Sequence, residues 1–141
     1  MNILVAEDDN LMLDLYRSWL AEILSEYSGN PIVVNMMSDG KELDMKLSQS
    51  KYDLTILDAA LPRMSGIDLY KKHRDNMGIV MLCSSYGDFF SRSLPGVNTR
   101  LVLNKPFSKD EFKSEIETAL KEVDYVNRKT NTNSREYTAI D

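Results

Sequence analysis

The sequence has few residues of several types, and each shortage excludes a class of protein. It holds one cysteine, Cys83, and one histidine among 141 residues. A single cysteine cannot form a disulfide within the chain, and no set of spaced Cys and His residues suggests zinc. No apolar run approaches the length of a membrane span, and the short apolar run at residues 3–6 leads into acids rather than a cleavage site. We therefore expect a cytoplasmic protein without a signal peptide.

The charge balance is mildly acidic and the composition is otherwise ordinary. The formal net charge is -5, with 43% hydrophobic and 28% charged residues. A negative chain offers no general attraction to a polyanion, so we expect no direct nucleic-acid binding. The length is that of one domain able to bury a core.

Short apolar runs alternate with helical patterns along the chain. We expect strands at residues 3–6, 32–34, 54–57, 79–83 and 101–103, and helices at 11–27, 41–48, 67–76, 88–94 and from a capping box at Ser108 and Glu111 to residue 123. This alternation favours an α/β fold with a doubly wound parallel sheet. Residues 1–123 would form the domain, and residues 124–141 the helix end and a disordered polar tail or linker.

Polar residues stand at the carboxyl ends of four predicted strands. They are Glu7, Asp8, Asp58, Ser84 and Lys105. In parallel sheets, ligands bind beyond the carboxyl ends of the strands, where the winding order switches. A single open sheet would therefore gather these side chains on one edge. Asp9 or Asn10 can cap the helix that follows the first strand.

Such a gathering has a specific chemistry. Three neighbouring carboxylates repel one another, and a hard divalent cation such as Mg²⁺ relieves the repulsion. Lys105 adds a positive charge and Ser84 a hydroxyl donor. The set could stabilise a phosphoryl group in transfer, with Asp58 as the nucleophile. Taken singly, the same residues fit ordinary roles as a helix cap, a surface charge or a turn hydroxyl.

Several motifs in this order resemble the receiver domain of bacterial response regulators. They lie at residues 3–9, 39–40, 53–58, 61–66, 84–87 and 105–107. Together they span about residues 2–123. The resemblance implies a flavodoxin-like fold of five parallel strands in the order 2-1-3-4-5.

The resemblance also implies a role for each site residue. Asp58 would accept a phosphoryl group from a sensor histidine kinase or phosphotransfer protein. Glu7, Asp8, Asp58 and the Ala60 carbonyl would form the Mg²⁺ site, with Asp8 as a direct ligand and Asp9 as the helix cap. Ser84 would contact the phosphoryl group and Lys105 would pair with it.

The expected activity is that of a phosphoacceptor rather than an enzyme. Such a domain catalyses only its own phosphorylation and dephosphorylation, and it signals by binding a downstream protein. A homodimer is left open. Two alternatives stand beside this function: a pseudo-receiver that binds its partner without phosphorylation, and a phosphatase with an aspartate nucleophile. The phosphatase would need a second aspartate where Ala60 stands.

The chain departs from the family pattern in three places. Between Asp8 and Asp58 it is about seven residues longer than usual, which corresponds to roughly two helical turns. Val102 occupies the position, three residues before Lys105, where the family usually has Tyr or Phe. Residues 89–103 lack the usual alanine-rich helix. We therefore expect a switch and a readout that differ from those usual in the family.

A few side chains outside the motifs also carry expectations. Trp19 and the leucines of the first helix are expected in the core, as are Phe89 and Phe90. We expect His73 to be solvated, because Lys71, Lys72 and Arg74 surround it in the sequence. Cys83 is expected to be an inert buried thiol. Tyr86 could pack or shade the phosphoryl group from water.

Overall fold

The predicted α/β fold is confirmed by the structure, a computed structural model that describes residues 1–27, 31–85 and 101–140, with side chains to residue 130. The strands are β1 (Asn2–Ala6), β2 (Val33–Met37), β3 (Leu54–Asp58), β4 (Ile79–Ser84) and β5 (Val102–Asn104). The helices are α1 (Asn10–Ser25), α2 (Gly40–Gln49), α3 (Gly66–Met77) and α5 (Lys109–Ile140). All strand pairs are parallel, in the order β2-β1-β3-β4-β5.

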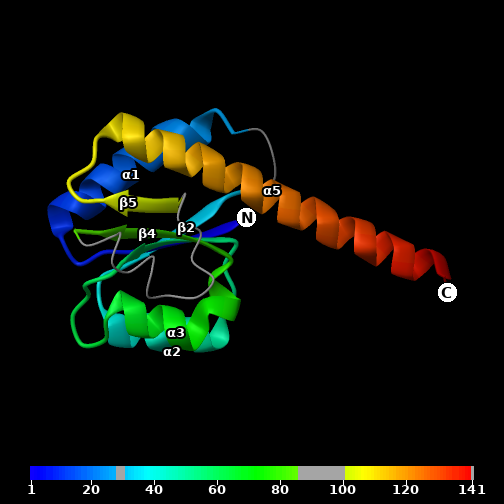
Figure 1. Ribbon diagram of the computed structural model, residues 1–141, viewed down its shortest axis with the longest axis horizontal. Coiled ribbons are helices and arrows are strands. Elements are labelled where there is room, and N and C mark those ends of the chain that lie inside the picture. The colour runs from blue at the N-terminus through cyan, green and yellow to red at the C-terminus, as the bar shows by residue number, and fades with distance from the viewer. Residues whose placement is uncertain (28–30, 86–100, 141) are drawn as a thin grey trace.

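The sheet lies between two layers of helices (Figure 1): α1 and α5 cover one face, and α2 and α3 cover the other. Each layer closes over its own apolar cluster, which we call the α1–α5 core and the α2–α3 core. Every residue of β3 is buried. A central strand covered on both faces needs an unbroken apolar run, which is why residues 54–57 carry no charge.

Side-chain caps fix where the helices begin. Asp9 caps α1 by accepting from the amides of Leu11 and Met12, which settles the choice between Asp9 and Asn10. The capping box before α5 is confirmed, because the Glu111 amide donates to Ser108 Oγ at 3.1 Å and Glu111 Oε1 accepts from the Ser108 amide at 3.4 Å. The first helix therefore starts two residues after Asp8, at the edge where the acids stand.

Two expectations about helix faces are wrong. Leu11 is 69% exposed, because the face of α1 that packs on the core carries Met12 and Leu13 in its first turn instead. Tyr16, which the pattern passed over, is 1% exposed. His73 is buried rather than solvated, and its Nε2 lies 2.6 Å from Asp44 Oδ1 of α2. That partner is 29 residues away in the sequence and only the packing of α2 on α3 brings it there.

The last helix is longer than expected. Its apolar residues from Phe112 to Val123 are buried, as predicted. The structure then continues α5 to Ile140, where a disordered tail was expected after residue 127. Figure 1 shows this part of α5 running beyond the sheet and away from the other elements.

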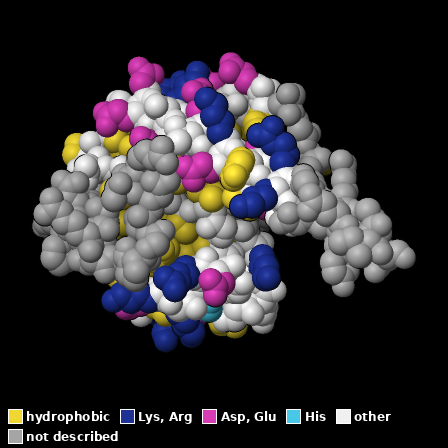
Figure 2. Space-filling model, turned by 45° about the vertical axis from the view of Figure 1, so that its right-hand side comes forward, with side chains coloured by type: hydrophobic (Ala, Val, Ile, Leu, Met, Phe, Trp, Pro, Cys, Tyr) yellow, Lys and Arg dark blue, Asp and Glu magenta, His cyan; other side chains and the backbone are white. Residues whose placement is uncertain are grey.

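Some expectations concern residues outside those described. These are the helix at residues 88–94 and the positions of Tyr86, Phe89 and Phe90. Within the described ranges, none of the helices combines the length and the apolar character that crossing a membrane requires. On the face shown in Figure 2, acidic and basic side chains are interspersed, with hydrophobic side chains between them.

Candidate functional site

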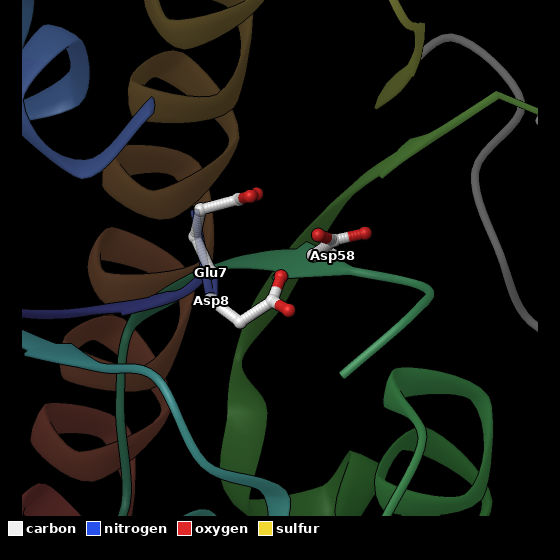
Figure 3. A group of neighbouring side chains, drawn as sticks. All are labelled: Glu7, Asp8 and Asp58. Carbon is white, nitrogen blue, oxygen red and sulfur yellow. The ribbon is translucent and has the colours of Figure 1, made fainter. Parts of the chain in front are cut away.

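Three carboxylates meet at the carboxyl edge of the sheet. Glu7 and Asp8 directly follow β1, and Asp58 is the last residue of β3, its neighbour in the sheet. Figure 3 shows the three side chains converging at this edge. One oxygen from each lies within 4.8 Å of the others, with Glu7 and Asp58 buried and Asp8 exposed. The topology thus brings together acids that are 50 residues apart in the sequence.

A lysine connects two of these acids. Lys105 Nζ lies 3.0 Å from Glu7 Oε2 and 3.0 Å from Asp58 Oδ2. The Lys105 amide donates to the Ser84 carbonyl at 3.0 Å, which fixes the start of the loop after β5 to the end of β4. Ser84 is buried at that strand end. The structure therefore places all five predicted side chains at one edge, with the lysine between the two buried acids.

The electrostatics of the site depend on burial. Glu7 is 1% exposed. Burial and, to a smaller extent, the negative charge on Asp58 together raise the pKa of Glu7 to about 7, against the opposing hydrogen bond from Lys105. Burial acts to lower the pKa of Lys105, but its bonds to Glu7 and Asp58 outweigh that effect, so its pKa lies above the usual value. The one ammonium thus pairs with two of the three carboxyl groups, which leaves the site short of positive charge.

The donor set fits a hard divalent cation. All three candidate side chains offer carboxylate oxygens, which Mg²⁺ prefers, and the exposed Asp8 leaves room for retained water. Oxygens bound to one Mg²⁺ lie at most about 4.2 Å apart, since each is about 2.1 Å from the ion. The observed spread within 4.8 Å is therefore close to what such an ion requires.

An aromatic cluster supports the loop that carries Lys105. Phe107 stacks on Tyr16 of α1, with ring centroids 6.3 Å apart, and Tyr16 in turn lies 5.2 Å from the ring of Phe112. Trp19 packs against both phenylalanines. The sequence pattern identified Trp19 and Phe112 as core residues but gave no signal for Tyr16, because its neighbours in the cluster are 91 and 96 residues further along the chain.

The loop between β3 and α3 is held by contacts that the sequence did not reveal. Arg63 Nε and Nη2 donate to the two carboxylate oxygens of Asp39, each at 2.7 Å. Asp39 also caps α2. The motifs at residues 39–40 and 61–66 predicted a turn and an irregular loop separately. Nothing in the local sequence pairs them, since Asp39 and Arg63 are 24 residues apart.

The structure thus combines a doubly wound parallel sheet, an acidic cluster at its carboxyl edge and a lysine paired with a buried aspartate. The family model of the response regulator receiver domain matches residues 3–117. The chain therefore belongs to the response regulator receiver family, as the motifs predicted.

A curated relative supports the same family assignment. The chain is 31% identical over 120 residues to response regulator protein PmrA of Pseudomonas aeruginosa, a match covering 82% of this chain and 51% of PmrA. The chain thus spans about half the length of that relative.

Solved structures show the same fold. The signal receiver domain of a Luxo repressor protein from Vibrio parahaemolyticus has a TM-score of 0.72 and 23% identity, covering 89% of this chain and 94% of that one. The receiver domain of a sensor histidine kinase from Pseudomonas aeruginosa has a TM-score of 0.66 and 18% identity, covering 86% and 96%. That second structure holds a magnesium ion coordinated in its active-site cleft.

Proposed function

We propose that Asp58 of this receiver domain accepts a phosphoryl group from the phosphohistidine of a sensor histidine kinase or phosphotransfer protein. The observation that carries the proposal is the position of Lys105, whose ammonium lies 3.0 Å from a carboxylate oxygen of Asp58 at the same edge as two further acids. Membership of the receiver family supports it. The phosphorylated form would then signal by binding a downstream protein.

In this reaction an Asp58 carboxylate oxygen attacks the phosphorus atom. A bond forms between that oxygen and phosphorus, the bond from phosphorus to the donor nitrogen breaks, and the electron pair stays on the imidazole, which carries a proton to leave as a neutral ring. Lys105 can turn its ammonium from the carboxylate to a phosphoryl oxygen, and the Ser84 hydroxyl at the next strand end can donate to another. Both residues thereby stabilise charge that grows on the transferred group.

We propose that Glu7, Asp8, Asp58 and the Ala60 carbonyl form the Mg²⁺ site, with Asp8, Asp58 and Ala60 as direct ligands and Glu7 as the supporting acid. When bound, the ion neutralises negative charge on the phosphoryl oxygens and holds them for in-line transfer. Ala60 is exposed next to Asp58, and its amide donates to Asp58 Oδ1 at 3.1 Å. This bond holds the carboxylate in a fixed orientation beside the proposed ligand.

We also propose that the chain acts as a phosphoacceptor in the cytoplasm rather than as an enzyme on external substrates, with residues 1–123 as the receiver body. An aspartate-nucleophile phosphatase is not favoured, because Ala60 stands where the second acid would be needed. A pseudo-receiver is not favoured either, because the acidic edge and the lysine lie close enough to act together.

The test is phosphorylation by a small donor. Incubated with acetyl phosphate and Mg²⁺, the protein should gain the mass of one phosphoryl group, and Asp58→Asn should gain none. The matched control is Asp68→Asn, which changes an exposed acid on α3 and should react like the unmodified protein. Phosphoryl incorporation that persists in Asp58→Asn would refute the assignment.

A further inference from the structure

Arg63 adopts a backbone conformation that its residue type disfavours. Its φ is 66°, in the left-handed region that glycine, asparagine and aspartate enter far more readily than arginine. Among the described residues it is the only non-glycine with positive φ. An arginine held there indicates that its side chain has a task that a glycine could not perform.

That task is visible in the contacts of the guanidinium. It forms a two-pronged ion pair with Asp39, with both N–H···O distances at 2.7 Å. Arg63 is 59% exposed and Asp39 23%, so neither needs the other merely to neutralise a buried charge. Asp39 Oδ1 also accepts from the amides of Lys41 and Glu42 at the start of α2. The pair therefore ties the loop after β3 to the first turn of a helix.

Beside this pair, the backbones of the two segments are also in direct contact. The Gly40 amide donates to the Pro62 carbonyl at 3.0 Å. A Cβ on Gly40 would lie 2.0 Å from the Met64 carbonyl oxygen, so only glycine fits at this contact. At the other end of the loop, the Gly66 amide donates to the Ala59 carbonyl at 3.0 Å. Ala60 thus lies within a short segment that is fixed on both sides.

We propose that Arg63 and Asp39 form a clamp that positions residues 59–65, and through them the Ala60 carbonyl and the Asp58 carboxylate, for Mg²⁺ binding. Both are positioning residues, because neither belongs to the cluster of Glu7, Asp8 and Asp58 that would hold the ion. The inference rests on the proposed function, since it concerns the Mg²⁺ site of the same reaction. A competing explanation is that burial of Leu61 and Met64 against the α2–α3 core holds the loop unaided.

Two variants that respect the local backbone separate these explanations. Asp39→Asn removes the charge but keeps a good helix cap for α2. Arg63→Asn removes the guanidinium and tolerates the left-handed backbone. The control is Asp14→Asn, which removes the same charge from the exposed Arg17–Asp14 pair on α1. The double variant Asp39→Asn with Arg63→Asn completes a mutant cycle.

The readouts are the Mg²⁺ dissociation constant by calorimetry and, in metal-free protein, the hydrogen exchange rate of the Gly40 and Ala60 amides. We expect both single variants to weaken Mg²⁺ binding by about threefold to tenfold and to speed exchange at both amides. The double variant should match the singles, because either change already opens the clamp. Asp14→Asn should leave both readouts unchanged.

The inference is overturned if the unmodified protein binds Mg²⁺ while the Asp39 and Arg63 variants stay within twofold of it in both readouts. Effects that add in the double variant would also overturn it, because the two residues would then act independently. Should Arg63→Asn fail to fold, Asp39→Asn decides alone. An unmodified protein that neither binds Mg²⁺ nor takes up phosphate would instead contradict the proposed function, and the clamp would lose its stated purpose with it.

Discussion

Two carboxylate–cation pairs in this molecule have similar geometry and opposite electrostatic consequences. At the sheet edge, Glu7 lies 3.0 Å from Lys105, and in the loop Asp39 lies 2.7 Å from Arg63. Burial raises the pKa of Glu7 to about 7. The Arg63 guanidinium lowers the pKa of the more exposed Asp39 to about 2. Ion pairing alone therefore does not decide the charge state of an acid here.

The difference lies in how much water each acid loses and how many acids share the cation. Glu7 is almost completely buried and shares Lys105 with Asp58, so its negative charge is only partly compensated. Asp39 keeps some solvent and has both prongs of a guanidinium to itself. In the first arrangement the negative charge exceeds the positive charge, so the site suits a metal cation that could in turn hold a phosphoryl group. In the second arrangement the guanidinium already neutralises the Asp39 carboxylate, which suits a structural ion pair.

The strongest way to break the buried arrangement is Lys105→Met. The phosphoryl oxygens would lose their ammonium partner, so incorporation from acetyl phosphate should fall about 10²-fold. Mg²⁺ affinity measured by calorimetry should not decrease, because the lysine is a neighbouring cation and not a ligand. Lys109→Met, which removes the exposed Lys109–Glu22 pair, should behave like the unmodified protein. Loss of Mg²⁺ binding in Lys105→Met would contradict the roles assigned.

The acid at the exposed end of the site sharpens the comparison. Asp8→Asn should weaken Mg²⁺ binding by about 10- to 100-fold, because the proposed carboxylate ligand would become a neutral amide. The free energy of unfolding should change by less than about 0.5 kcal/mol, since Asp8 is exposed. Asp9→Asn is the matched neighbour: asparagine still caps α1, and both affinity and stability should hold. Equal loss of affinity in the two variants would disprove the choice of Asp8 as ligand.

The smallest expected effect is the pH dependence of the stability that the Asp39–Arg63 pair contributes. Because the pKa of Asp39 is lowered on folding, its contribution to stability is present above its unfolded pKa of about 4 and is lost as the pH falls toward 2. Asp39→Asn lacks this contribution at every pH. The difference in unfolding free energy between the two proteins, measured by urea titration, should therefore shrink between about pH 4 and pH 2. A constant difference would show that the pair adds no pH-dependent stability.

The sheet could be predicted because its determinants are local. Apolar runs such as residues 54–57 mark strands, and the alternation with helical patterns selects a parallel sheet, whose carboxyl ends must share an edge. This geometry is enough to bring Glu7, Asp8 and Asp58 together. The start of α5 could also be predicted, because a capping box involves only four consecutive residues, Ser108 to Glu111.

What could not be predicted depends on contacts between distant elements. His73 is buried beside Asp44 of α2, 29 residues away in the sequence, and Leu11 is exposed because Met12 and Leu13 take the core-facing positions of its turn. The Asp39–Arg63 pair joins the turn at residues 39–40 to the loop at residues 61–66, and neither motif by itself indicates the other as its partner. In addition, α5 runs on to Ile140 through a segment whose polar composition favours a disordered tail.

The most direct test of the central claim is a crystal structure of the protein with Mg²⁺ and beryllium trifluoride, which mimics a phosphoryl group on an aspartate. We predict the fluoride adduct on Asp58, the Lys105 ammonium in contact with it, and one cation ligated by Asp8, Asp58 and the Ala60 carbonyl. A structure in which the adduct sits on another residue, or in which the cation lies away from this acidic edge, would contradict the account.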